Sequence, residues 1–153
     1  SESANIIKSH VTEGVKLAKR FKIPEIVYKG IIEHHGDGVI RYFYEKEKSE
    51  NSDALKEDFR HLGQKPSSKE SAILMLADSL EAACRAIFMV EDADEEKIKS
   101  VIEEIFNEKI ADDQLSKAPI TFEELSIIKD SFQKSLEGLY HQRVLYPEIS
   151  EEE

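Results

Sequence analysis

Two adjacent histidines, His34 and His35, are the first residues whose type and position could do chemistry. Neighbouring side chains on a helix point about 100° apart, so both rings reach one metal ion only near a helix end or a distortion. Gly36 supplies such an end, because glycine readily adopts the backbone conformations that stop a helix. A pair of surface histidines with no shared ligand is the alternative interpretation.

His10 is a third imidazole that the chain can bring to the same point. It lies in an expected amphipathic helix over residues 4–20, which a turn at 21–24 separates from the next helix. If the two helices form an antiparallel hairpin, His10 comes level with His34 and His35, since each is about a dozen residues from the turn. Three imidazoles could then bind one divalent metal ion. A lone histidine is otherwise more often a satisfied or exposed side chain.

Asp78 is the other candidate ligand, because it interrupts the apolar run from Ala72 to Ala77. A buried carboxylate is costly unless it is paired or binds a metal ion. Glu81 and Arg85 follow on the same face of the helix. Two interpretations are therefore open: a metal ligand, or an internal ion pair of Arg85 with Asp78 or Glu81.

Helices must position these residues, because the hydrophobic pattern is helical along most of the chain. The expected helices cover residues 4–20, 24–35, 68–88, 94–109 and 121–140. Ser67 or Ser68 can cap the third of them, and Thr121 with Glu124 fits a capping box. The helix over 68–88 is the most apolar and is expected to be central and mostly buried. The sequence predicts an all-α domain.

Residues 39–44 are aromatic and β-branched, a composition that would allow a strand. A short helix or an ordered loop is the preferred interpretation, because no second strand candidate exists to pair with them. Residues 45–58 are mostly charged and polar and predict an exposed, mobile insertion. The aromatic rings of Tyr42, Phe43 and Tyr44 could stack on a planar ring of a ligand, or they could pack beneath a lid.

Composition limits the partners and the compartment. The 153 residues carry a formal net charge of −11, which argues against duplex nucleic acid but not against a small phosphate ligand held through metal cations. The single cysteine, Cys84, permits no internal disulfide, so a reducing compartment is the default expectation. No apolar run is long enough to cross a membrane and no signal peptide opens the chain, so any membrane contact is expected through a part outside it.

Together these features resemble the HD superfamily of metal-dependent phosphohydrolases. The segment from His10 through Pro24 to Gly36 is similar to the second half of an HD domain. The segments 58–60, 65–83 and 141–147 resemble more specifically the seven-transmembrane HD group, whose cytosolic domain hydrolyses cyclic di-AMP to the linear dinucleotide. No Gly-Tyr-Pro follows the histidine pair, which separates the chain from relatives that cleave cyclic di-GMP.

The resemblance implies an HD-type helical bundle over residues 1–147 that lacks its first helices, and a disordered tail at 148–153. It implies two divalent metal ions per complete domain, Fe or Mn first, with Zn, Ni or Mg as alternatives. His10, His34 and His35 match the ligands of one ion, and Asp78 matches a ligand of the other. The remaining ligands belong to a His-Asp pair and an earlier histidine. The chain has no His-Asp dipeptide, so these are expected upstream.

The implied function is hydrolysis of a cyclic dinucleotide, cyclic di-AMP to linear pApA. Candidate substrate contacts are Lys65, Lys69, Arg85 and Tyr42, each of which could instead be an ordinary surface or packing side chain; no catalytic residue is assigned. The full-length protein is expected at the cytoplasmic face of a membrane, and this chain alone is expected to be soluble and inactive. A homo-oligomer is left open.

Two alternative functions remain. One is a non-catalytic regulatory or interaction module on a degenerate HD scaffold. The other is a nucleotide phosphohydrolase of the wider HD superfamily. A His-Asp pair upstream in the reading frame would favour an enzyme, and its absence would favour the module.

Overall fold

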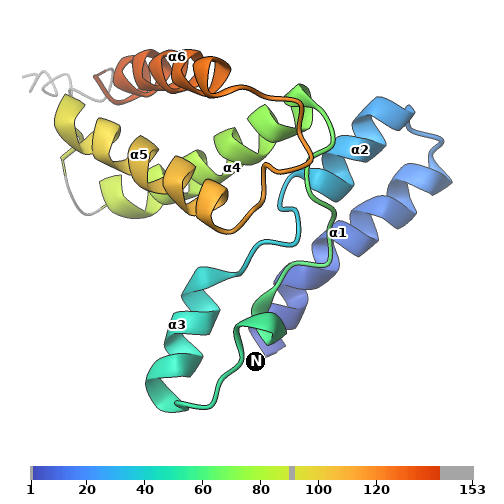
Figure 1. Ribbon diagram of the computed structural model, residues 1–153. Helices are drawn as coiled ribbons and strands as arrows, with labels where there is room; N and C mark the ends of the chain where they lie inside the picture. Colours follow the sequence, from blue (N-terminus) through green and yellow to red (C-terminus); the bar gives the residue numbers. More distant parts are fainter. Residues whose placement is uncertain (1, 90–91, 142–153) are drawn as a thin grey trace, which may run out of the picture.

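The computed structural model describes residues 2–89 and 92–141. Within them the secondary structure is helical, apart from one isolated β-bridge, and the all-α prediction is confirmed (Figure 1). In chain order the helices are α1 (Glu2–Arg20), α2 (Glu25–Glu33), α3 (Arg41–Glu50), the 3-10 helix η1 (Lys56–Phe59), α4 (Lys69–Phe88), α5 (Glu95–Ala111) and α6 (Phe122–His141). The predicted tail, 148–153, and residues 142–147 lie outside the described residues.

The helices form a bundle and a hairpin that meet at α4. Helix α4 packs on α5, α5 packs on α6, and α2 of the α1–α2 hairpin contacts α4, while α3 extends away from the bundle beside η1 (Figure 1). The buried core lies mainly between α4 and α5, and its members are Ala72, Met75, Leu76, Leu80, Cys84, Phe88, Ile98, Val101, Ile102, Phe106, Leu115 and Leu125. This core fixes α4, from which Asp78 projects.

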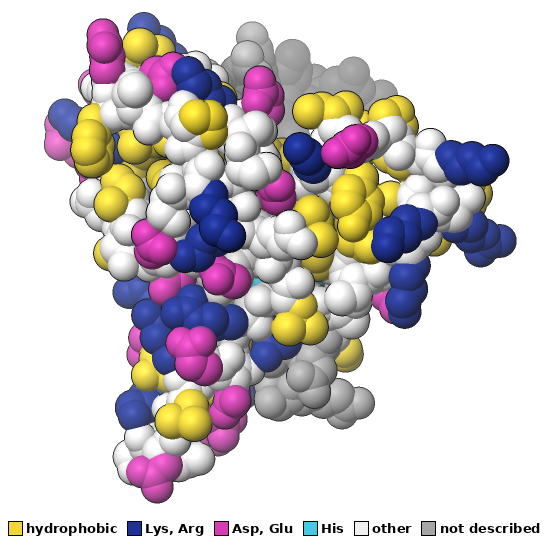
Figure 2. Space-filling view, turned by 45° about the vertical axis from the view of Figure 1, so that its right-hand side comes forward, with side chains coloured by type: hydrophobic (Ala, Val, Ile, Leu, Met, Phe, Trp, Pro, Cys, Tyr) yellow, Lys and Arg dark blue, Asp and Glu magenta, His cyan; other side chains and the backbone are white. Residues whose placement is uncertain are grey.

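Helix α4 is central, but the prediction that it is mostly buried was only partly right. Ile73 and Leu74 are 37% and 44% exposed, because α5 packs on one side of α4 and α2 reaches only part of the other. Large apolar side chains of the α1–α2 hairpin are exposed as well, among them Phe21 and Ile26. The space-filling view shows apolar side chains of this kind interspersed with charged ones (Figure 2).

Side-chain caps begin the helices where the sequence predicted them. The Ser68 hydroxyl accepts a hydrogen bond from the Ser71 amide at the start of α4. At the start of α6, the Thr121 amide donates to the Glu124 carboxylate at 2.9 Å, and the Glu124 amide donates to the Thr121 hydroxyl at 3.1 Å. These reciprocal bonds satisfy backbone donors that have no partner within the helix. The predicted capping box is confirmed.

The segment after the histidine pair differs from its prediction in two ways. Residues 45–50, predicted as part of a mobile insertion, are helical and continue α3. Val39 forms an isolated antiparallel bridge with Arg60, so the short extended stretch does have a partner. That partner was missed because Arg60 lies in a polar segment with no strand pattern of its own. None of the helices in the described ranges is long and apolar enough to cross a bilayer.

Candidate metal centre

The α1–α2 hairpin brings His10 to the histidine pair. Gly14 on α1 allows close packing, because a Cβ atom there would lie 2.8 Å from the Ile31 side chain of α2. Val11 and Ala18 are buried, and Pro24 is the N-cap of α2, directly after the turn. The hairpin predicted from the spacing of the histidines is therefore present.

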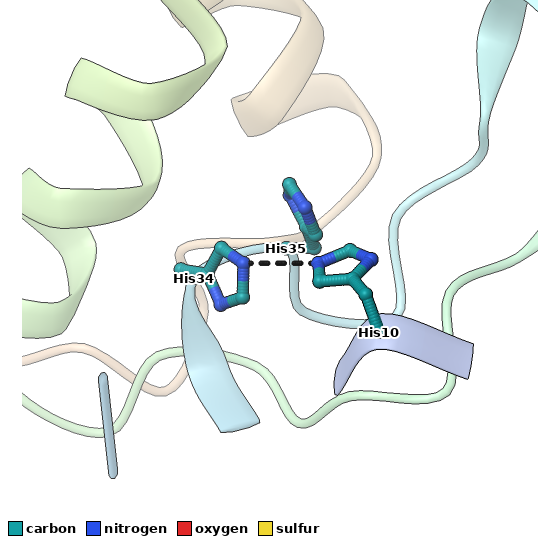
Figure 3. Close-up of side chains that lie close together, drawn as sticks. All are labelled: His10, His34 and His35. Carbon is teal, nitrogen blue, oxygen red and sulfur yellow. Dashed lines mark hydrogen bonds between the residues drawn. The ribbon is translucent and has the colours of Figure 1, made fainter. Parts of the chain in front are cut away.

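Three imidazoles converge at the open end of this hairpin (Figure 3). Ring nitrogens of His10, His34 and His35 all lie within 4.8 Å of one another. The Nε2 atoms of His10 and His34 are 3.3 Å apart, close to the about 3.4 Å expected for two nitrogens on one tetrahedral metal at about 2.0–2.1 Å. The predicted convergence is confirmed, and the role of the three residues as ligands stays a prediction.

The hydrogen bonds of these rings suit a shared cation. The Nδ1 atom of His34 lies 2.9 Å from the Ile31 carbonyl, and the Nδ1 atom of His10 contacts the Ile7 carbonyl. A carbonyl only accepts, so each Nδ1 donates, and a neutral ring then keeps no hydrogen on Nε2. When both rings are neutral, the two Nε2 lone pairs face each other across 3.3 Å, and a metal ion between them would stabilise that arrangement.

His35 is held in its neutral, metal-binding form. Burial, first, and positive charge on the neighbouring His34, His61 and His10 rings and on Lys109 together lower its pKa to about 3. A neutral imidazole is the form that binds a metal ion. Its position at the helix end follows from the backbone: α2 ends at Glu33, and Gly36 has a φ of +58°.

Asp78 reaches this cluster from α4. Its Oδ2 atom lies 3.3 Å from Nδ1 of His35, while Arg85 pairs with Glu81 at 3.4 Å. The expectation of a buried carboxylate was wrong, because the Asp78 side chain is 42% exposed at the edge of the bundle. Of the two pairings considered for Arg85, the structure shows the one with Glu81. Asp78 faces the histidines.

His61 is a neighbour that the sequence interpretation missed. Its ring stacks on His35 with centroids 4.3 Å apart and an angle of 25° between the planes. Burial, first, and nearby positive charge lower the pKa of His61 to about 4, and its buried Nδ1 atom has no hydrogen-bond partner in the part of the chain that the structure describes. Four of the five histidines in the chain therefore lie together here. The small number of histidines was the only feature of the sequence that could have suggested His61 as a member of the site.

The loop after η1 lies along the histidine turn and supports it. The His61 amide donates to the Gly38 carbonyl, and the Gln64 amide donates to the Ile32 carbonyl, both at 2.9 Å. Gly63 makes this approach possible, because a Cβ atom there would lie 2.6 Å from the Gly36 carbonyl oxygen.

Glu33, the last residue of α2, fixes the turn from its other side. Its carboxylate is buried and accepts hydrogen bonds from the Ser67 amide at 2.9 Å and the Ser67 hydroxyl at 2.7 Å. Burial alone would raise the pKa of Glu33, but hydrogen bonds from Ser71 and Ser67 outweigh it and lower the pKa. The group stays charged and keeps both bonds at neutral pH.

The four candidate substrate contacts have other neighbours in the structure. Lys65 pairs with Asp113 at 2.7 Å, Lys69 pairs with Glu124, and Arg85 pairs with Glu81. The Tyr42 side chain is 71% exposed beside Phe43. Their role toward a substrate stays a prediction.

The sequence of the chain is similar to that of known proteins. The family model of the HD domain matches residues 1–83, more than half of the chain. Two proteins named cyclic-di-AMP phosphodiesterase PgpH, from Bacillus subtilis and Listeria monocytogenes, are 36% and 37% identical to the chain over 97% and 96% of its length. The chain spans only 20% of each of them.

One solved structure is similar over nearly the whole chain. The crystal structure of the L. monocytogenes PgpH HD domain in complex with cyclic di-AMP superposes with a TM-score of 0.86 at 36% identity. The likeness covers 95% of this chain and 67% of that one.

Proposed function

Because the chain belongs to the HD domain family, we propose that it is the metal-binding part of a phosphodiesterase that hydrolyses a cyclic dinucleotide, most readily cyclic di-AMP, to the linear form. The observation that carries the proposal is the convergence of His10, His34 and His35 on one point. It occurs in a chain that superposes on an HD domain solved with cyclic di-AMP.

In this proposal the three histidines hold one divalent ion, and Asp78 is a ligand of a second. The donor set fits, because His35 is neutral, the Nε2 atoms of His10 and His34 lie 3.3 Å apart, and Asp78 is within reach of His35. Bound divalent cations would neutralise phosphate charge and lower the pKa of a water molecule. Imidazole and carboxylate donors suit Fe or Mn, and also Zn, Ni or Mg.

The chain's own groups prepare this site before any ion binds. The carbonyls of Ile7 and Ile31 orient the rings of His10 and His34. His61 packs flat on His35 and limits the directions in which that ring can turn. Holding ligands in place before binding lowers the entropic cost of capturing a cation.

Other parts of a longer protein are proposed to complete the site. The relatives extend well beyond the stretch that this chain matches. We propose that a His-Asp pair in such a part supplies the remaining ligands, and that the whole protein acts at the cytoplasmic face of a membrane.

The test is hydrolysis of cyclic di-AMP by the complete protein and by this chain, each supplied with Mn²⁺ or Fe²⁺. The complete protein should release linear pApA, and this chain alone should not, because it contains no His-Asp pair. His34→Ala in the complete protein should abolish turnover. Binding without turnover by the complete protein would overturn the enzyme proposal in favour of a regulatory module. Turnover by this chain alone would show that its ligand set is already sufficient.

A further inference from the structure

One buried amide lies directly beneath the histidine turn. Gln114, on the link between α5 and α6, is 1% exposed. Its Nε2 atom donates to Oδ1 of Asp37 at 2.8 Å, and to the carbonyl and Oδ2 of Asp112, both at 3.1 Å. All three partners are acceptors, so the amide nitrogen must face them and the orientation of the side chain is fixed.

The other end of the same amide fills the space under Gly36. Its Oε1 atom is buried and has no hydrogen-bond partner among the described residues. A Cβ atom added to Gly36 would lie 2.2 Å from this oxygen, so the amide packs against the backbone of the turn and leaves no space for a side chain there. A buried acceptor without a hydrogen bond destabilises the folded chain, so its presence here calls for an explanation.

Arg60 closes the network around Gln114. Its guanidinium donates to the Asp37 carbonyl at 2.9 Å and to the Asp112 carboxylate at 3.2 Å. Asp37 is therefore held through its side chain by Gln114 and through its backbone by Arg60. Since Asp37 is two residues after His35, a shift of Asp37 moves the end of the histidine turn.

We infer that Gln114 is a positioning residue for the metal-binding turn, acting through Asp37 and Gly36 on the rings of His34 and His35. The inference rests on the proposed function, in which those rings bind a divalent cation. The amide contributes two things: an N–H donor that fixes the Asp37 carboxylate, and a surface that fixes the backbone at Gly36. Partners behind metal ligands typically change metal affinity when they are lost.

The test compares Gln114→Leu and Gln114→Glu with Gln133→Leu in the full 153-residue chain. Leu keeps the approximate volume and loses the donors, whereas Glu keeps the shape and sets an acceptor against Asp37 and Asp112. Gln133 is the control, because its amide also donates to a carboxylate, that of Glu137 at 2.8 Å, but on α6. Circular dichroism establishes that each variant keeps its helices.

Mn²⁺ affinity is the first readout, measured by calorimetry. Both Gln114 variants should bind Mn²⁺ about 10–100-fold more weakly than wild type, and Gln133→Leu should bind as wild type does. The second readout needs no metal: the ring ¹⁵N resonances of His34 and His35 should shift in the Gln114 variants and not in the control. Unchanged affinity and unchanged ring resonances in Gln114→Leu would overturn the inference.

Two further outcomes keep the inference separate from the proposed function. If wild type binds no Mn²⁺, the proposed metal site fails in this chain, and the metal-free ring resonances alone decide the role of Gln114. If the Gln114 variants do not fold, Asp37→Ala removes the acceptor at the turn and leaves the core amide in place. That variant should shift the same resonances, and their failure to move would refute the inference.

Discussion

The Nδ1 atom of His35 lies 3.3 Å from Oδ2 of Asp78, so a carboxylate on α4 meets the imidazole at the end of α2. This contact joins the hairpin to the bundle at the point where the metal site is proposed. Asp78 is 42% exposed and His35 is neutral at pH 7, so the contact itself adds little to stability. Metal binding therefore explains an aspartate at this position better than a contribution to the stability of the fold does.

Asp78→Ala in the complete protein should abolish hydrolysis of cyclic di-AMP while the fold is kept. The free energy of unfolding of the metal-free chain should change by less than about 1 kcal/mol, because a half-exposed contact to a neutral ring is weak. Thermal melts and activity assays measure the two effects. Glu81→Ala is the control, since it removes the pair with Arg85 and should keep full activity. Destabilisation by several kcal/mol, with activity following the folded fraction, would withdraw Asp78 as a ligand.

The stability of the metal-free chain should fall as the pH is lowered from about 7 toward 5. Burial first, and neighbouring charge second, lower the pKa of His35 to about 3 and that of His61 to about 4, against 6.5 for an ordinary imidazole. At pH values between these lowered pKa values and 6.5, the unfolded state binds more protons than the folded state, so acid favours unfolding. Urea denaturation at pH 7.5, 6 and 5 measures the slope. His61→Phe keeps a flat ring on His35 and should make the slope shallower; an unchanged slope would contradict the assignment.

Lys65→Ala in the complete protein should raise KM for cyclic di-AMP by about tenfold or more if the ammonium binds a phosphate oxygen. Lys65 follows the loop that lies along the histidine turn, and its present partner is Asp113 at 2.7 Å. Lys99→Ala, on an exposed position of α5, is the control and should leave KM unchanged. Equal KM values for the two variants would assign Lys65 to its pair with Asp113 alone.

Local patterns in the sequence were sufficient for the five helices α1, α2, α4, α5 and α6 and for three of the gathered histidines, but not for the second half of α3. Apolar periodicity and caps such as Ser68 predicted the helix boundaries, because those signals act within a few residues. The equal spacing of His10 and His34 from one turn predicted their meeting, since a hairpin places residues by their distance from its turn. Asp78 was found because a carboxylate within an apolar run is conspicuous, although the burial inferred from that run was wrong.

Residues that depend on contacts between distant loops could not be predicted in the same way. His61 reaches His35 because Val39 pairs with Arg60, and the segment of Arg60 carries no strand pattern. Gln114 reaches Asp37 across 77 positions of sequence, through a link whose course depends on how α5 packs. Nothing in the local sequence around Gln114 distinguishes it from an exposed loop residue.

Gly36→Ala should destabilise the chain by about 1–3 kcal/mol and weaken Mn²⁺ binding in parallel. The φ of +58° is unfavourable for alanine, and the new Cβ atom would lie 2.2 Å from Oε1 of Gln114 and 2.9 Å from Cε of Met75. Gly138→Ala is a matched control on α6, because no atom of residues 2–89 or 92–141 lies within 4 Å of its Cβ position and alanine favours a helix by about 0.5–1 kcal/mol. Urea denaturation and calorimetry with Mn²⁺ compare the two. If Gly36→Ala is as stable as Gly138→Ala and binds Mn²⁺ like wild type, the turn does not need its left-handed glycine, and the close contact with Gln114 does not constrain the histidines.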